Sequence, residues 1–136
     1  MQLLWAVDHG LQSTSKRMNA SLGLTGPQRL VLRLVGRFPG IPAGNLADLL
    51  FLHPSTLTGV LRRLEERGLL RRKKDPADGR RALFELTAKG KKLDVPSKKT
   101  VESAVARALE DVNPRDAAAA KRVLTALHTA LVDVED

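Results

Sequence analysis

The residues of this sequence that are best suited to chemistry are its cations, which bind anions. Residues 62–92 hold 12 Lys and Arg against five Asp and Glu, whereas the rest of the chain holds 11 against 10. Most of the net charge of +8 therefore lies in one short stretch. Such focusing is typical of a protein that binds a polyanion, nucleic acid first and an anionic membrane second. A solvated charged face is the alternative interpretation.

The middle of this basic stretch has the pattern of a β-hairpin. Residues 69–74 and 81–87 are strand candidates, the second with apolar side chains at every other position. Between them, residues 75–79 read Asp-Pro-Ala-Asp-Gly, which is strong turn chemistry. Four cations flank the turn as candidate DNA contacts: Lys73, Lys74, Arg80 and Arg81.

Duplex DNA would explain why so much like charge lies on one hairpin. A two-stranded ribbon can reach the minor groove, whose negative potential attracts inserted arginine. Repulsion among the cations is relieved when they neutralise phosphates and release the condensed counterions. Asp75 and Asp78 are expected to neutralise part of the tip and to orient Arg80.

A helix is predicted over residues 54–67, because Pro54 suits its first turn and Gly68 suits the left-handed position after its end. Its apolar face is Leu57, Val60, Leu61 and Leu64. The opposite arc carries hydroxyls, a glycine and arginines, which can bond phosphates or base edges in a major groove. Gly59 costs about 1 kcal/mol relative to alanine in a helix, so structure alone does not require it. A solvated helix face is the alternative. The candidate DNA contacts on this arc and its flanks are Ser55, Thr58, Gly59, Arg62 and Arg63.

Short elements around this helix complete a winged helix, residues 25–87. Residues 43–50 form another helix, and the three residues that separate it from Pro54 are typical of a helix-turn-helix. The domain begins with a helix opened by a capping box of Thr25 and Gln28. The expected buried face of that helix is Leu30, Val31, Leu34, Val35 and Phe38. The predicted fold class is mainly α with a small β-wing.

Helices outside the winged helix are predicted to form a dimer. Residues 1–24 and 88–136 have helical patterns, with a break at Pro96 and a new start at Asn113. Both segments carry apolar stripes that two copies of the chain would bury against each other. Coverage of their own domain alone is the alternative. The stripes are Leu4, Val7, Leu11, Met18 and Leu22, then Val101, Val105, Leu109, Val112, Ala120, Val123, Leu124, Leu127, Leu131 and Val134.

Several motifs between Leu46 and Thr87 carry a family resemblance: NLADLL, STLTGVLRRLEERGLLRR, DPADGRR and FELTAKG. This run resembles the MarR family of bacterial transcriptional regulators, and the flanking helices match that family's dimerisation region in order. The resemblance implies a homodimeric winged helix-turn-helix repressor, or less often an activator, bound to a pseudo-palindromic DNA operator. It also implies release from DNA by a small, often aromatic, anionic or xenobiotic ligand.

The family's functional positions can be placed on this sequence. Its wing-tip D-x-R pair falls on Asp78 and Arg80, and its base readers fall around Ser55, Thr56 and Thr58. Two positions depart from the family pattern, and both lie on the predicted recognition helix. Arg62 stands where an Asp commonly partners the wing arginine, and Gly59 stands where a larger, often basic, residue is usual. The helix–wing ion pair and the base readout are therefore expected to differ here.

A small-molecule effector site is expected where the dimer helices meet the DNA-binding lobe. Trp5, His9 and Arg17 are the candidate lining residues. The alternative places Trp5 in the dimer core and Arg17 on the surface.

Other kinds of chemistry lack the residues they need. With no cysteine, disulfides and thiolate metal sites are excluded. His9, His53 and His128 lack metal-ligand spacing, and no phosphate-binding glycine loop or nucleophile elbow occurs. We therefore predict no enzyme activity, no catalytic residue, no metal and no cofactor, and we expect His53 to cap the helix that follows it.

The apolar runs are too short to span a membrane, and the first residues lack a leader pattern, so we expect a cytoplasmic protein with no membrane partner. Two other functions stay open at this point. One is a basic winged-helix module that binds structured RNA, and the other is a protein–protein adaptor.

Overall fold

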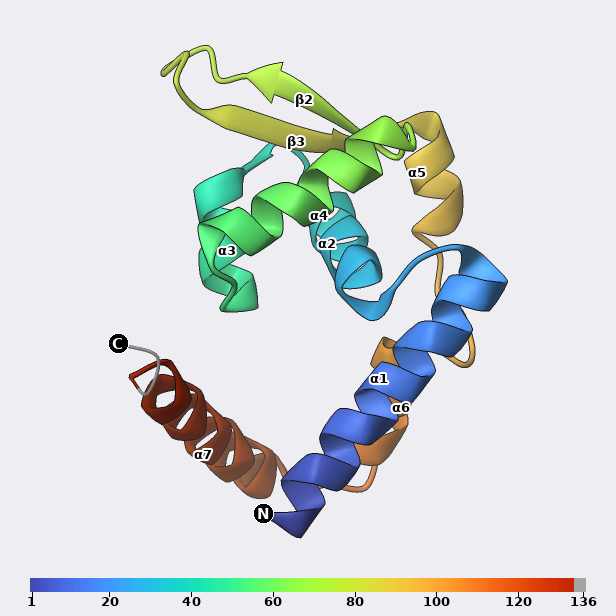
Figure 1. Cartoon of the computed structure of the whole chain (residues 1–136), viewed down its shortest axis with the longest axis vertical. Helices are drawn as coiled ribbons and strands as arrows, with labels where there is room; N and C mark the ends of the chain where they lie inside the picture. Colours follow the sequence, from blue (N-terminus) through green and yellow to red (C-terminus); the bar gives the residue numbers. More distant parts are fainter. Residues whose placement is uncertain (134–136) are drawn as a thin grey trace. The chain divides into compact units, whose positions relative to one another are not determined.

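The computed structural model describes residues 1–133 and shows a mainly helical chain with one small sheet, which confirms the predicted fold class (Figure 1). The chain divides into two compact units, the first being Met1–Val101 and the second beginning at Glu102. The elements in chain order are α1 (Gln2–Leu22), α2 (Gly26–Arg37), β1 (Ile41–Pro42), α3 (Ala43–Leu50), α4 (Pro54–Glu66), β2 (Leu70–Lys74), β3 (Ala82–Leu86), α5 (Ala88–Leu93), α6 (Val101–Leu109) and α7 (Pro114–Val132).

Helices α3 and α4 form the predicted helix-turn-helix, and the β2–β3 hairpin follows at once. The hairpin runs beside α4 and its turn projects away from the helices (Figure 1). A third strand, β1, pairs antiparallel with β3, with Ile41 opposite Phe84. The sheet order is β1-β3-β2. Strand β1 was not predicted, because two residues are too few to show an alternating pattern.

Local signals in the sequence fix both ends of α4. The His53 imidazole accepts the Ser55 N–H at its start, which confirms the predicted cap. Gly68 adopts φ +66 after its end, as predicted. The helix stops at Glu66, one residue earlier than predicted, and Arg67 is its C-cap. All four predicted apolar residues are buried: Leu57, Val60, Leu61 and Leu64.

Each hairpin strand is one residue shorter at its base than predicted, and β3 also starts one residue later. The Leu69 N–H donates to the Leu64 carbonyl at 2.9 Å, so Leu69 belongs to the end of α4. The Thr87 hydroxyl accepts the Gly90 N–H at 3.0 Å, so Thr87 caps α5. These two residues serve the neighbouring helices, although they also join at the hairpin base through the Thr87 N–H and the Leu69 carbonyl.

Helix α2 confirms the capping box of Thr25 and Gln28, but its predicted buried face was partly wrong. Leu30 is 50% exposed and Phe38 is 45% exposed, whereas Arg29 and Leu32 are buried. The guanidinium of Arg29 donates to the carbonyl oxygens of Leu93 at 2.9 Å and Val95 at 2.8 Å, which satisfies its buried donors. Periodicity of apolar residues alone could not foresee that an arginine takes a core position.

The terminal helices start and stop where the sequence indicates. Gly23 ends α1 at φ +66, the chain leaves the helical state between α5 and α6 around Pro96, and the Asn113 side chain caps α7. Within the described chain, Met18 of the predicted stripes is buried, whereas many others are exposed. Val112 lies beyond the end of α6, and Val134 lies outside the described residues. The exposed members are Leu4, Val7, Leu11, Val105, Leu109, Val112, Ala120, Val123, Leu124 and Leu131.

Candidate nucleic-acid interface

The polar arc of α4 is accessible along its length. Five of the six predicted DNA contacts on α4 are exposed, namely Ser55, Thr56, Thr58, Arg62 and Arg63. The Thr58 hydroxyl donates to the Pro54 carbonyl at 2.8 Å. The hydroxyl proton of Thr58 is therefore already used. Its oxygen lone pairs could accept a hydrogen bond from a base amino group, and its methyl group could contact the methyl of thymine.

Gly59 leaves an opening in this arc. A Cβ built at this position meets no atom within 4 Å, so packing inside the chain does not require glycine. Glycine nevertheless costs the helix about 1 kcal/mol relative to alanine. Because glycine has no side chain, a partner that lies against α4 can approach the helix backbone closely at this position.

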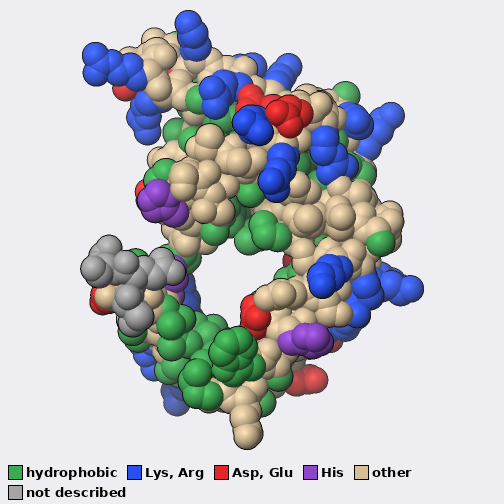
Figure 2. All heavy atoms as spheres, in the orientation of Figure 1, with side chains coloured by type: hydrophobic (Ala, Val, Ile, Leu, Met, Phe, Trp, Pro, Cys, Tyr) green, Lys and Arg blue, Asp and Glu red, His purple; other side chains and the backbone are tan. Residues whose placement is uncertain are grey.

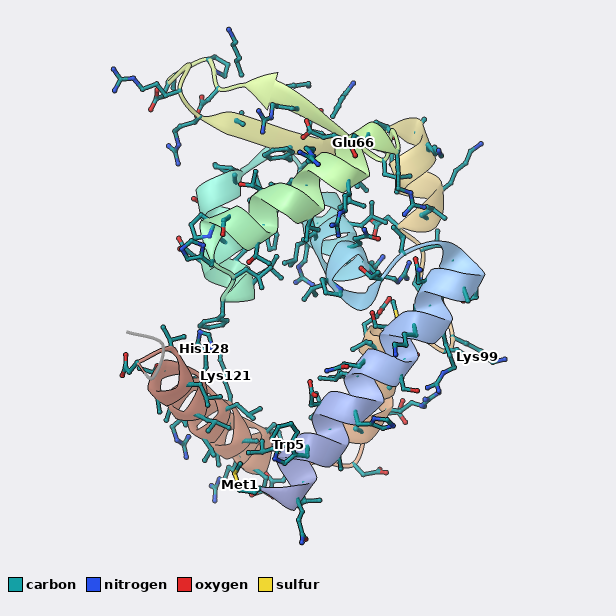
Figure 3. The ribbon with its side chains drawn as sticks, in the orientation of Figure 1. Met1, Trp5, Glu66, Lys99, Lys121 and His128 are labelled. Carbon is teal, nitrogen blue, oxygen red and sulfur yellow. The ribbon has the colours of Figure 1, made fainter. Side chains whose placement is uncertain are left out.

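Arg62 bonds within its own helix and not to the hairpin. Its Nε lies 3.2 Å from Glu66 Oε1, one helical turn further on (Figure 3 labels Glu66). The helix–wing ion pair is made instead by Arg72 of β2, whose Nε lies 3.6 Å from Glu65 Oε1 on α4. The Arg72 guanidinium also lies 5.4 Å from the centre of the buried Phe84 ring. Arg72 thus links the hairpin to α4 in a way that the sequence did not reveal.

Strand alternation divides the run of four cations between two faces of the hairpin. Arg72 and Lys74 share the face of buried Phe84, which we call the inner face. Arg71 and Lys73 lie on the other face, which we call the outer face, together with Glu85 opposite Arg71. The predicted contacts Lys73 and Lys74 therefore point to opposite sides.

On the outer face the cations are paired. Arg71 Nη2 lies 2.7 Å and Lys73 Nζ lies 2.9 Å from the same carboxylate oxygen of Glu85. Hydrogen bonds from Lys73 and Arg71 lower the pKa of Glu85 from its ordinary value of 4.5. This carboxylate therefore keeps its charge to more acid pH than an isolated glutamate.

The turn of the hairpin is held by its aspartates through the main chain. Asp78 accepts the Arg80 N–H at 3.0 Å, and Asp75 accepts the Ala77 N–H at 2.9 Å. Asp78 thus holds the main chain of Arg80, and within residues 1–133 it makes no ion pair with the Arg80 guanidinium. Short aspartate side chains commonly fold a turn in this manner.

The tip cations remain available for anions. Lys74, Arg80 and Arg81 are exposed, and within residues 1–133 none of the three makes an ion pair. Lys and Arg side chains extend around the hairpin in the space-filling view (Figure 2). The structure therefore brings Arg72 of the inner face against α4, leaves Lys74, Arg80 and Arg81 exposed on the hairpin, and pairs Lys73 with Glu85 on the outer face.

The three candidate effector residues all lie on α1. Trp5 is 67% exposed (Figure 3) and His9 is exposed. Arg17 donates to the Ser13 and Thr14 hydroxyls, both at 3.0 Å, so its guanidinium bonds within its own helix. The effector site remains a prediction.

Two further kinds of site are absent from residues 1–133. Within them, no three His, Asp or Glu side chains gather closely enough to hold a metal ion. No helix in the same range has the length and apolar character that a membrane span needs.

The fold and this surface define a winged helix-turn-helix protein, and comparisons identify its family. The profile of the MarR family matches residues 22–81. The chain is 31% identical over 125 residues to the HTH-type transcriptional repressor Mb2911 of Mycobacterium bovis, covering 92% of this chain and 90% of that one. The chain belongs to the MarR family of transcriptional regulators.

Two more similarities extend this finding. The transcriptional regulator HosA of Escherichia coli O111:H- is 40% identical over 82 residues, which is 60% of this chain and only 61% of the length of HosA. The structure of S. aureus MepR in a complex with DNA has a TM-score of 0.76 at 21% identity and covers 96% of both chains, so it supports the fold alone.

Proposed function

We propose that the protein binds double-stranded DNA sequence-specifically as a homodimer and regulates transcription. In each subunit α4 enters a major groove, and the hairpin reaches the adjacent minor groove. The observation that carries this proposal is that the exposed polar arc of α4 is followed by a hairpin whose Lys74, Arg80 and Arg81 are exposed and make no ion pair within residues 1–133. A relative over nearly the whole chain is named a repressor, which favours repression.

The dimensions of α4 suit this role. At about 1.5 Å per residue, its 13 residues span about 20 Å, which is enough to lie across a major groove. Its hydroxyls and Gly59 would face base edges, and Arg62 and Arg63 would contact bases or phosphates. Two α4 helices of a dimer would then bind half-sites about 34 Å apart on one side of the duplex.

Residues 1–24 and 88–136 are proposed as the dimerisation segments. Many residues of their apolar stripes are exposed within a single chain, and Leu124 and Leu131 of α7 are examples. A second copy of the chain is the simplest partner, because a two-fold axis places the same stripe on both sides of an interface. A small aromatic or anionic effector that contacts Trp5, His9 and Arg17 is proposed to release the DNA.

Selection from a random duplex pool, followed by an affinity titration, tests the proposal. The full-length protein should enrich one pseudo-palindromic sequence. Arg80→Ala should then weaken binding to that sequence by about 1–3 kcal/mol, or roughly 5- to 150-fold, because it removes a minor-groove cation. Lys121→Ala, on exposed α7, is the matched control and should bind as the wild type does.

Two results would count against the proposal. Enrichment of no sequence would exclude sequence-specific binding. Equal affinity of Arg80→Ala and the wild type for the selected duplex would remove the hairpin from the mechanism.

A further inference from the structure

Glu85 holds two cations of the hairpin in a compact ionic cluster. Its Oε2 accepts hydrogen bonds from Arg71 Nε at 3.0 Å and Nη2 at 2.7 Å, and Lys73 Nζ lies 3.0 Å from Oε1. Both carboxylate oxygens are therefore engaged. The side chain of Glu85 is only 23% exposed.

The position of this cluster matters when a ribbon lies along a minor groove. Such a groove is about 6 Å wide and has a phosphate strand on each side. Arg72 on the inner face lies 3.6 Å from Glu65 of α4. In the proposed complex the inner face, with Lys74, would therefore be directed toward the phosphate strand between the two grooves. The outer face would be directed toward the other strand, where Arg71 and Lys73 could bind phosphates if Glu85 did not hold them.

The geometry points to Glu85 as a specificity-determining residue that acts as an internal substitute for a DNA phosphate. It occupies Arg71 and Lys73 and so keeps them from adding to sequence-independent affinity. This inference rests on the proposed function. Its chemistry is simple, since a carboxylate within 3.0 Å of both cations presents the same kind of acceptor as a phosphate oxygen.

Such a residue raises specificity by lowering total affinity. Phosphate contacts contribute to every duplex alike and carry no sequence information directly. Two additional cations would strengthen binding to all competing sites, whereas base contacts from α4 would be unchanged. A regulator gains discrimination when the ratio of specific to non-specific affinity is large.

Salt dependence gives the sharpest test. The full-length wild type and Glu85→Gln would be titrated by fluorescence anisotropy with a mixed-sequence duplex of about 30 base pairs, between 50 and 200 mM salt. Each released cation should steepen the plot of log affinity against log salt by about 0.9. The advantage of Glu85→Gln over the wild type should therefore grow roughly 3- to 12-fold as salt falls across this range.

Two control variants decide whether the gain comes from these two cations. Glu110→Gln removes the same charge from an exposed residue of the second unit and should leave the slope unchanged. Adding Arg71→Gln and Lys73→Gln to Glu85→Gln should abolish the gain. An equal gain in Glu110→Gln, or a gain that survives in the triple variant, would overturn the inference.

A second measurement does not depend on the folding of Glu85→Gln. In the protein with Glu85 intact, Lys73→Gln alone should lose less affinity than Lys74→Gln alone, because Glu85 already holds the Lys73 ammonium and Arg71 still pairs with the carboxylate afterwards. The opposite order would overturn the role of Glu85. If the wild type binds no duplex at 50 mM salt, the proposed function falls as well, whereas an unchanged slope in Glu85→Gln removes only this inference.

Discussion

Helices α4 and α7 both carry a regular apolar stripe, yet only one of them buries it within the chain. Leu57, Leu61 and Leu64 of α4 are almost fully covered by the first unit. In the described part of α7, no residue is buried, and Leu124 is 57% exposed. An apolar stripe that is buried within its own subunit contributes to the core, whereas an exposed apolar stripe is typical of an interaction surface. Helix α4 thus contributes to the core of its own unit, whereas α7 is the helix proposed for dimerisation.

The largest effect is expected from a matched pair of leucine deletions. Leu64→Ala removes a fully buried side chain from the core and should lower the free energy of unfolding by about 2–5 kcal/mol at any protein concentration. Leu124→Ala should cost stability only where the proposed dimer forms, so its effect should depend on protein concentration. Urea unfolding at low and high concentration measures both. A Leu124→Ala loss that is independent of concentration would place that stripe inside a single chain.

Two glycines lie in helices for different reasons, since packing requires Gly90 but does not require Gly59. A Cβ at Gly90 of α5 would collide with the main-chain carbonyl oxygen of Leu69. Gly90→Ala should therefore destabilise the protein by about 1–3 kcal/mol, as overpacking of a core does. Thermal unfolding measures this loss. Unchanged stability would show that α5 can move away from Leu69 without cost.

Gly59 of α4 should respond in the opposite direction. Its missing Cβ would meet nothing within 4 Å, so Gly59→Ala should stabilise the protein by up to about 1 kcal/mol. The same methyl should weaken binding to the selected duplex if a base pair approaches the helix there. Chemical denaturation and a DNA titration on one preparation test both halves. A variant that is more stable and binds DNA as tightly as before would remove Gly59 from the interface.

These contrasts also show which parts of the structure a sequence can predict. The capping box at Thr25, the His53 cap and Gly68 are local, since each depends on residues within a few positions. The burial of Arg29 depends on carbonyl groups more than 60 positions away in the chain. No periodicity within α2 carries that information, so the position could not be predicted from the pattern.

In the candidate site, too, local features could be predicted from the sequence and features that depend on packing could not. Exposure of the α4 arc follows from helical periodicity, and the turn chemistry predicts the hairpin. Strand alternation does place Lys73 and Lys74 on opposite faces, but only the register puts Arg71 opposite Glu85. The ion pair of Arg72 with Glu65 depends on how the hairpin packs on α4, which sequence spacing does not reveal.

The smallest expected effect is the pH dependence of stability that Glu85 contributes on the outer face of the hairpin. The pKa of Glu85 is lowered in the folded protein by Lys73 and then Arg71. A carboxylate with a lowered pKa stabilises the fold above its unfolded value, here about 4.5, and loses that contribution as pH falls through the folded value. The stability difference between the wild type and Glu85→Gln should therefore be present at neutral pH and shrink as pH falls below about 4.5 through the lower folded-state pKa.

Urea unfolding of both proteins across this pH range measures the difference directly. Glu110→Gln, whose carboxylate makes no ion pair within residues 1–133, controls for the loss of one negative charge. Because the cluster lies at the surface, a modest difference is expected. A difference that stays constant through the acid range would show that Arg71 and Lys73 do not hold Glu85 in solution. Arg71 and Lys73 on the outer face would then be as available to phosphates as the tip cations Arg80 and Arg81.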